Sequence, residues 1–429
     1  MTLQEIQNAF VDLIRIPSIT GSAGGEEQAC AYLEALLDTY GITHERVSRD
    51  PKRPNLLACI KAENPVLDPM ILISHIDVVA GDESKWSHGV FSGDIAEGRI
   101  WGRGTLDTKQ LTMMELYTFL NLKGREAELS RDVWFFATID EEGGSAYGME
   151  YVKQAKPELF KNAMVINEGG GFPLHINGKD YMMLTVGEKA VCKVKIWAEG
   201  TGGHASAPSD DQAVLKLSEG LRRIFADEKN LNCGSRHTYN TMKEIVGSED
   251  WDNAVGADIF GYAGQNSIGL RNYQIGLRSN VIPAKAETVL EFKVLPYTEV
   301  SEITAFLNRN LEGLPASYEI LSYEDGFESH FDNSHLKELV AQLNAACTRY
   351  GFSGQVLPML ALGRTDGRFF GSEGSMVYGC SPLLMGDSFD VVLPKVHGHN
   401  ESILETSFQF GCQVLHEIIE KNCLTGGAK

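Results

Sequence analysis

Short apolar runs alternate with helical patterns through the first part of the chain. Apolar residues three and four positions apart predict helices over 3–13, 30–37 and 108–122. Uninterrupted apolar runs predict buried strands over 56–60, 70–73, 133–139 and 163–166. Strands of this kind, separated by helices, are typical of a mostly parallel sheet with helices on both faces. We therefore expect an α/β fold here.

A different pattern begins near residue 186. Apolar and polar residues alternate along 192–199 and 290–294, and this period of two predicts strands with only one covered face. Helical patterns lie at 211–226 and 299–311. We therefore expect an inserted α+β domain over residues 186–325, within a main domain that is formed by residues 1–185 and 326–429.

Composition and charge exclude several classes of function. The 429 residues carry a formal net charge of −20, whereas proteins that bind nucleic acid or anionic lipid rely on surplus lysine and arginine. No apolar stretch approaches the ~18 residues of a membrane-spanning helix. The first residues lack the pattern of a signal peptide, and the eight scattered cysteines include no CxxC pair. We expect a cytoplasmic protein with no nucleic-acid or membrane partner.

Side chains that can bind metal ions follow the ends of several predicted strands. Three strands are each followed by a histidine or by carboxylates, while a glycine-rich turn and a late HGHNE segment add further groups. Open α/β sheets bind ligands beyond the carboxyl ends of their strands, so these groups would meet in one crevice. The groups are His75, Asp77, Asp107, Glu141, Glu142, Glu168, His397 and His399.

Each of these signals is weak alone, because an acidic run such as DEEGG usually lies in a solvated loop and a single histidine is more often structural. Together, imidazoles and carboxylates without thiolates suit Zn²⁺, Co²⁺ or Mn²⁺. Charge balance favours two ions, because two divalent cations are balanced by Asp107, Glu142, Glu168 and one hydroxide. The sequence therefore predicts a dinuclear metal site.

Two further carboxylates adjoin the expected ligands. Glu141 stands next to Glu142 but is not needed as a ligand, so it is placed to take a proton from a water as general base. Asp77, two residues from His75, is placed to accept the second N–H of that imidazole and to fix its tautomer.

The order and spacing of these motifs resemble the co-catalytic zinc hydrolases that include aminoacylase, acetylornithine deacetylase, succinyl-diaminopimelate desuccinylase and glutamate carboxypeptidase. The similarity runs nearly end to end. Its motifs are SHIDVV at 74–79, WGRGTLDTK at 101–109, DEEGG at 140–144, NEGGG at 167–171 and HGHNE at 397–401. The resemblance implies a zinc-exopeptidase-like α/β catalytic domain and a ferredoxin-like inserted lid domain.

The resemblance also assigns a role to each ligand. Asp107 would bridge two ions, His75 and Glu168 would hold one of them, and Glu142 and His397 would hold the other. Glu141 would be the general base and Asp77 the partner of His75. His397 is preferred to His399 because it fits the pattern H-x-x-N-E, which leaves His399 as a loop residue.

The inserted domain carries its own similarity. GTGGHASAP at 200–208 resembles the lid motif, whose His204 would stabilise the tetrahedral oxyanion, although an ordinary Gly-Pro surface turn is the alternative. SNVIP at 279–283 and GRTDGRFF at 363–370 resemble the segments in which Asn280 and Arg368 bind the substrate carboxylate. In many dimeric relatives the lid histidine comes from the partner subunit, so we expect a homodimer through this domain, with a monomer as the alternative.

Three positions depart from the pattern of the family. Gln110 replaces the glycine that commonly follows D-x-K, Arg364 replaces a second glycine in the carboxylate loop, and His88 stands where proline is frequent. None of these changes removes a ligand. Arg364 would add positive charge at the specificity pocket.

The resemblance implies hydrolysis of an amide bond next to a free carboxylate, in a dipeptide, a C-terminal peptide bond or an N-acyl amino acid. A glutamate such as Glu168, rather than an aspartate, tends to accompany N-acyl-amino-acid hydrolases. Two alternatives belong to other classes. One is a catalytically silent metal-binding sensor or scaffold of the same fold, and the other is a binding protein with one metal or none.

Overall fold

The computed structural model describes residues 1–22, 24–207, 209–247, 261, 263–275, 280–329 and 333–425. These residues form two compact units, each with its own hydrophobic core. The first unit takes in the described residues of Met1–Val186, Thr241–Val255 and Ser329–Lys429, and the second those of Gly187–Asn240 and Gly256–Glu328. Each unit is described by itself.

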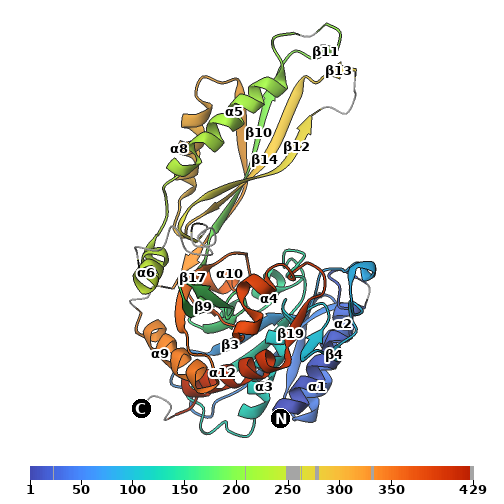
Figure 1. Ribbon diagram of the computed structural model, residues 1–429, viewed down its shortest axis with the longest axis vertical. Coiled ribbons are helices and arrows are strands. Elements are labelled where there is room, and N and C mark those ends of the chain that lie inside the picture. The colour runs from blue at the N-terminus through green and yellow to red at the C-terminus, as the bar shows by residue number, and fades with distance from the viewer. Residues whose placement is uncertain are drawn as a thin grey trace. The chain divides into compact units, whose positions relative to one another are not determined.

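The large sheet of the first unit, of which β3, β9 and β17 are labelled in Figure 1, is parallel at its centre and antiparallel on either side. Its strand order is β1-β2-β6-β3-β7-β18-β9, and β8 and β17 also pair with β9. The four strands β6, β3, β7 and β18 run parallel to one another. The bounds are β1 His44–Asp50, β2 Arg53–Ile60, β3 Met70–His75, β6 Val133–Thr138, β7 Met164–Asn167, β8 Pro173–Ile176, β9 Lys179–Glu188, β17 Gln355–Ala361 and β18 Met376–Gly379.

Helices cover both faces of this sheet, as the apolar runs predicted. Phe135 and Phe136 are neighbours in β6 and therefore point to opposite faces. Phe135 stacks on Phe119 of one helix layer, and Phe136 packs against Phe370 on the other face. The helices are α1 Leu3–Ile14, α2 Gly25–Thr39, α3 Lys109–Leu122, α4 Met149–Ala155, α9 Ser334–Arg349, α10 Arg368–Gly371, α11 Phe389–Val392 and α12 Glu405–Cys423, and three-residue to four-residue 3₁₀ turns occur at Glu83–Lys85, Pro157–Phe160 and Met385–Asp387.

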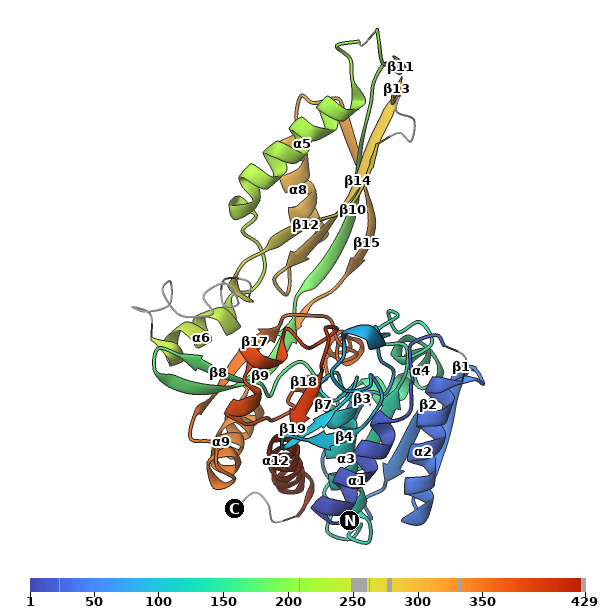
Figure 2. The same cartoon turned by 45° about the vertical axis from the view of Figure 1, so that its right-hand side comes forward.

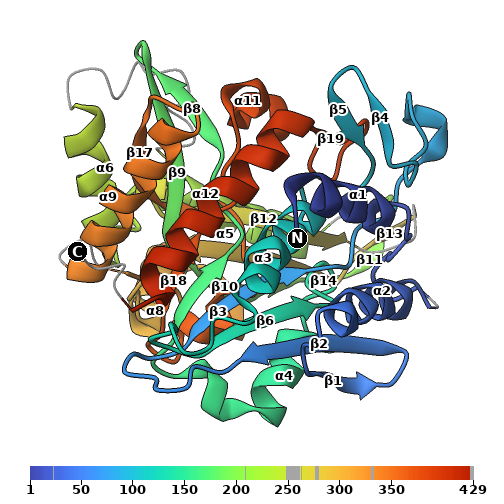
Figure 3. The same cartoon turned by 90° about the horizontal axis from the view of Figure 1, so that it is seen from below.

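The helices α1, α3, α12 and α9 lie side by side (Figure 3). None of the described helices is long and apolar enough to cross a membrane. A separate three-stranded sheet, in the order β19-β5-β4, brings two distant loops together. Its strands are β4 Asp94–Ala96, β5 Arg99–Trp101 and β19 Ser402–Leu404. Because β5 precedes the 102–107 turn and β19 follows the 397–401 loop, this sheet aligns the two segments.

The second unit has a four-stranded antiparallel sheet with two helices on one face (Figure 2). Its strand order is β12-β14-β10-β15, and the chain order β-α-β-β-α-β gives the expected ferredoxin-like arrangement. Cys192, Val194 and Ile196 of β10 are buried while Lys193 is exposed, so the predicted alternation is confirmed. The bounds are β10 Ala190–Glu199, β11 Gly203–His204, α5 Ala213–Asp227, a 3₁₀ turn Glu228–Asn230, β12 Ser267–Ile275, β13 Val281–Ile282, β14 Lys285–Val294, α8 Val300–Leu311 and β15 Ala316–Glu324. The helix α6 His237–Val246 begins in this unit, and its residues 241–246 are counted in the first unit. The short strand β16 Phe327–Glu328 pairs with residues 187 and 188 at the end of β9.

Candidate active site

The parallel centre of the large sheet determines where the candidate ligands lie. His75 is the last residue of β3 and is paired with Thr138, the last residue of β6. Glu141 and Glu142 follow β6, and Glu168 directly follows β7. Since these strands are parallel neighbours, their carboxyl ends meet at the same edge of the sheet.

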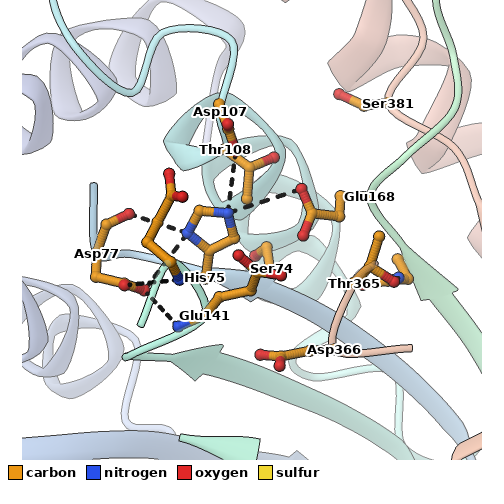
Figure 4. A network of polar contacts seen from close by, with 12 residues as sticks. Ser74, His75, Asp77, Asp107, Thr108, Glu141, Glu168, Thr365, Asp366 and Ser381 are labelled. Atoms are coloured by element: carbon orange, nitrogen blue, oxygen red, sulfur yellow. Dashed lines mark hydrogen bonds and ion pairs between the residues drawn. The ribbon is translucent and has the colours of Figure 1, made fainter. Parts of the chain in front are cut away.

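The Asp107 carboxylate lies between two imidazoles. Its Oδ1 is 3.1 Å from Nε2 of His75, and its Oδ2 is 3.1 Å from Nε2 of His397. Nε2 of His75 also lies 3.7 Å from Glu168 Oε2, and Nε2 of His397 lies 3.0 Å from the Glu142 carboxylate. Figure 4 shows Asp107 and Glu168 converging on the His75 ring. The two oxygens of Asp107 are thus directed at two different imidazoles, with Glu168 beside His75 and Glu142 beside His397.

This donor set fits a pair of divalent cations. Ligand atoms of His75, Asp107 and Glu142 lie within 4.8 Å of one another, and so do those of His75, Glu141 and Glu168. The donors are imidazole nitrogens and carboxylate oxygens, which suit Zn²⁺, Co²⁺ and Mn²⁺. Glu141 lies as close to His75 and Glu168 as a ligand would, so the geometry accommodates it either as a ligand or as a base.

The electrostatics of the cluster favour bound positive charge. Burial and the Glu168 carboxylate raise the pKa of Glu141 well above its usual value, and burial raises the pKa of Glu168 to about 7. Hydrogen bonds to Asp107 and Glu142 raise the pKa of His397 to about 10. Carboxyl groups that resist ionisation and an imidazole that holds its proton both indicate a site that attracts cations.

Asp77 supports both His75 and the loop that carries the two glutamates. The backbone carbonyl of Asp77 lies 2.9 Å from His75 Nδ1, and its carboxylate lies 3.5 Å away. Because a carbonyl only accepts, Nδ1 carries a proton, and Nε2 is the nitrogen that would bind a cation once the ring is neutral. The Asp77 carboxylate also accepts bonds from the Thr20 hydroxyl at 2.7 Å and from the N–H groups of Glu141 and Glu142 at 3.3 Å.

The remaining residues of DEEGG shape the loop rather than the cluster. Asp140 accepts hydrogen bonds from the Arg53 guanidinium at 2.7 Å and the Tyr147 N–H at 2.9 Å. A Cβ at position 143 would lie only 2.5 Å from Oδ1 of Asp140, so Gly143 permits this contact. Gly144 has φ +99°, which L side chains rarely adopt. The two glycines therefore let the loop present Glu141 and Glu142.

Glu401 joins the loop of Asp107 to the loop of His397, a role that the sequence did not indicate. Its Oε1 accepts the N–H groups of Gly104 and Leu106 at 3.0 and 2.7 Å, and its Oε2 accepts Arg103 Nη1 at 2.6 Å. Arg103 Nη2 donates to the Gly398 carbonyl at 2.7 Å, next to His397. Arg103 and Glu401 are both buried, so this ion pair sets the separation of two candidate ligands.

Replacing Glu401 with glutamine should lower the free energy of unfolding by about 3–5 kcal/mol, because Arg103 would keep its charge in a buried site without a balancing carboxylate. Burial raises the pKa of Glu401 to about 7, so urea unfolding of the metal-free protein should be measured at about pH 8, where the carboxylate is ionised. Glu128→Gln, which breaks an exposed pair with Arg125, is the control and should leave the midpoint unchanged. If Glu401→Gln left the midpoint of urea unfolding unchanged, the proposed structural role of the Arg103–Glu401 ion pair would be wrong.

The predicted substrate arginine, Arg368, is held by its own loop and by the loop that follows β6. The Arg368 guanidinium donates to the Thr365 carbonyl at 2.8 Å and to Ser145 Oγ at 3.1 Å, and it lies over the Phe369 ring. A cavity adjoins the cluster, and its described lining includes Arg364 rather than Arg368. The carboxylate-binding role of Arg368 therefore stays a prediction.

Gln110 and His399, to which the sequence assigned no chemical role, lie at different places relative to the metal cluster. Gln110 lines the cavity beside the cluster, and its Nε2 donates to the Leu106 carbonyl at 2.8 Å. Both histidines are exposed, but Nε2 of His397 lies 3.1 Å from Asp107 and 3.0 Å from Glu142, and His397, unlike His399, is among the described residues that line the cavity. This difference supports the choice of His397 as the ligand.

His204 and Asn280 lie together in the second unit. His204 is the last residue of β11 and Asn280 directly precedes β13, its antiparallel partner, and the Ala205 N–H donates to the Asn280 carbonyl at 3.1 Å. Both side chains are exposed, and Nδ1 of His204 is 2.8 Å from Ser206 Oγ. Pro208 and Ser279, at the ends of the two motifs, lie outside the described residues. The roles of His204 and Asn280 at the metal cluster stay predictions.

Comparisons with known proteins agree with this geometry. Residues 71–421 match the family model described as peptidase family M20/M25/M40. Human N-fatty-acyl-amino acid synthase/hydrolase PM20D1 is 24% identical over 97% of this chain and 87% of that protein, and aminoacylase-1 of Sus scrofa is 25% identical over 91% and 89%. The M20 family metallo-carboxypeptidase Sso-CP2 from Sulfolobus solfataricus shares the fold, with a TM-score of 0.74, 18% identity and coverage of 97% and 98%. So does the Bacillus subtilis YxeP protein, titled a dinuclear metal binding peptidase, with a TM-score of 0.60, 14% identity and coverage of 97% and 98%.

Proposed function

Because the chain belongs to peptidase family M20/M25/M40 and is a metal-dependent hydrolase of amide bonds, we propose that it cleaves an amide next to a free carboxylate in a small substrate with two metal ions. The observation that carries the proposal is the Asp107 carboxylate, whose two oxygens face His75 and His397 separately. A carboxylate in this position can bridge two cations. Zinc is the ion we propose first, with Co²⁺ and Mn²⁺ as substitutes.

The proposed mechanism divides the work among a few side chains. When bound, the two cations polarise the scissile carbonyl and lower the pKa of a water toward ~7. Glu141 takes the proton of this water and then delivers it to the leaving amine, a task suited to a buried carboxyl group whose pKa is raised. His204 donates a hydrogen bond to the developing oxyanion. Asn280 and Arg368 bind the carboxylate of the substrate.

We propose N-acyl amino acids as the first substrate class and dipeptides as the second. The glutamate at position 168 supports this order, and so do the names of two relatives, an N-fatty-acyl-amino acid synthase/hydrolase and an aminoacylase. The experiment is a turnover screen of N-acetyl, N-succinyl and N-carbamoyl amino acids and of dipeptides. Chelated enzyme is assayed alone and after addition of Zn²⁺, Co²⁺ or Mn²⁺. Turnover that requires added metal supports the proposal, and no turnover of any of these amides with any metal contradicts it.

Replacing His204 with alanine should lower kcat about 10²–10³-fold, because one donor to the oxyanion is lost. The bound metal should be unchanged, because His204 belongs to the second unit and is not among the described residues of the metal cluster. Steady-state kinetics together with metal analysis check both statements. His175→Ala, which removes another exposed histidine, serves as the control. A kcat equal to that of the wild type would remove His204 from the mechanism.

A homodimer through the domain at 186–325 and a cytoplasmic location also belong to the proposal. The eight cysteines are all free and mostly buried, which supports a reducing compartment. Sedimentation measures the oligomeric state directly. If His204 serves the partner subunit, mixed dimers of inactive Glu141→Ala and inactive His204→Ala chains should regain activity after subunit exchange, and no recovery would contradict a shared site.

A further inference from the structure

A cavity of about 370 Å³ opens beside the metal cluster in the first unit. One side of it is formed by polar groups of the cluster, among them Glu141, Glu142, Glu168 and His397. The rest of the lining is largely apolar. Its main apolar members are Phe172, Met183, Phe389, Val392, Leu393 and Val396.

Most of this apolar wall belongs to the packed core of the unit. Met183 of β9 and Val392 of α11 are each 1% exposed, and the Phe172 ring packs edge-on against Phe389 with centroids 6.1 Å apart. Leu393 is different, because it is 51% exposed and forms part of the rim. A wall that is fixed by core packing is already formed before a ligand arrives, as is usual for small-molecule sites.

We propose that this cavity takes an apolar group of the substrate, an acyl chain or an amino-acid side chain, attached to the amide that is cleaved at the cluster. The proposal rests on the proposed function and deepens it by naming the substrate class. A volume of about 370 Å³ is several times the ~30 Å³ share of one water molecule, so the cavity has room for an amino-acid side chain or a short acyl chain. Filling it removes apolar surface of both partners from water, which is the main favourable contribution in such sites.

Two polar side chains in the lining suggest the opposite substrate preference, for an acidic or polar group. Arg364 would favour an acidic group, and Gln110 has an Oε1 atom without a hydrogen-bond partner among the described residues. Gln110 Nε2, however, is 3.3 Å from Ser381 Oγ, so the two side chains already interact. The apolar residues form the larger part of the lining, and we infer that they determine the substrate preference.

Two substrate series measure the preference. The first varies the acyl chain of one amino acid from acetyl through butanoyl to hexanoyl, and the second varies the side chain of N-acetyl amino acids through Gly, Ala, Leu, Phe and Glu. Zinc-loaded enzyme gives kcat/KM, and calorimetric titration of the Glu141→Gln protein gives Kd for the same compounds. We expect an approximately fourfold gain for each buried methylene in at least one series, with a negative heat-capacity change on binding.

Two variants test whether the increase in kcat/KM per added methylene arises in this cavity. Leu393→Gln places a polar group on the rim of the cavity and should lower the fold-gain in kcat/KM that each added methylene gives. Val391→Gln is the matched control, because Val391 lies two residues away in the chain, is 39% exposed and does not line the cavity. The control should behave as the wild type.

The outcomes separate this inference from the proposed function. If both series are flat, if the glutamate side chain is preferred, or if Leu393→Gln and Val391→Gln behave alike, the inference is wrong while hydrolysis stands. If no compound is cleaved, the proposed function is wrong, and the Kd values of the Glu141→Gln protein still decide whether the cavity selects apolar groups.

Discussion

Replacing Glu141 with glutamine should lower kcat about 10²–10⁴-fold, the usual contribution of a general acid–base group, while both cations stay bound. The expected loss follows from the position of Glu141, which lies within 4.8 Å of the ligand atoms of His75 and Glu168 and has a raised pKa because of burial. Glutamine has nearly the same shape but cannot take up the proton of a water. Steady-state kinetics on protein of known metal content measure this effect.

The same experiment decides whether Glu141 is a base or a ligand. Glu142→Gln is the matched comparison, because Glu142 faces His397 at 3.0 Å and should lose metal together with activity. If Glu141→Gln also loses a cation, Glu141 binds metal and another group must move the proton. Substantial turnover by a metal-loaded Glu141→Gln enzyme would exclude it as the base.

Replacing Asp107 with alanine should abolish activity and greatly weaken the binding of both cations. Asp107 provides one carboxylate oxygen to each half of the cluster. Its removal therefore leaves the cation beside His75 and Glu168 with one ligand fewer, and the cation beside His397 and Glu142 as well. The wild-type protein should gain thermal stability with zinc, by about 2.7 kcal/mol when free zinc is a hundred times the Kd. The variant should lose this gain.

Metal analysis and thermal unfolding, each with and without zinc, test the effect of Asp107. Asp94→Ala, which changes an exposed aspartate of the small sheet, is the control and should keep the metal content and the response to zinc. Retention of one full equivalent by Asp107→Ala would show that Asp107 is a ligand to a single ion rather than a bridge.

The order of the strands explains why much of the site could be predicted. His75 and Glu168 follow apolar runs that form the adjacent parallel strands β3 and β7, and parallel strands end at the same edge. The helices on both faces and the alternation in β10 likewise follow from hydrophobic periodicity. The antiparallel strands on either side of the parallel centre had no comparable signal, because pairing direction depends on how distant segments cross.

Contacts made by the backbone could not be predicted in this way. The closest acceptor of His75 Nδ1 is the carbonyl of Asp77 rather than its carboxylate, and a carbonyl is present at every position of the chain. Glu401 holds a loop through N–H groups of Gly104 and Leu106, which no side-chain pattern reveals. The apolar wall of the cavity could not be predicted either, because Phe172 and Phe389 are distant in the sequence and come into contact only in the folded chain.

Diffraction from a crystal grown with zinc, recorded at the zinc absorption edge, tests the central claim most directly. The account predicts two anomalous peaks about 3.5–4 Å apart, one beside His75 and Glu168 and one beside Glu142 and His397, with one oxygen of Asp107 directed at each. A single peak, or two peaks that do not share Asp107, would contradict it.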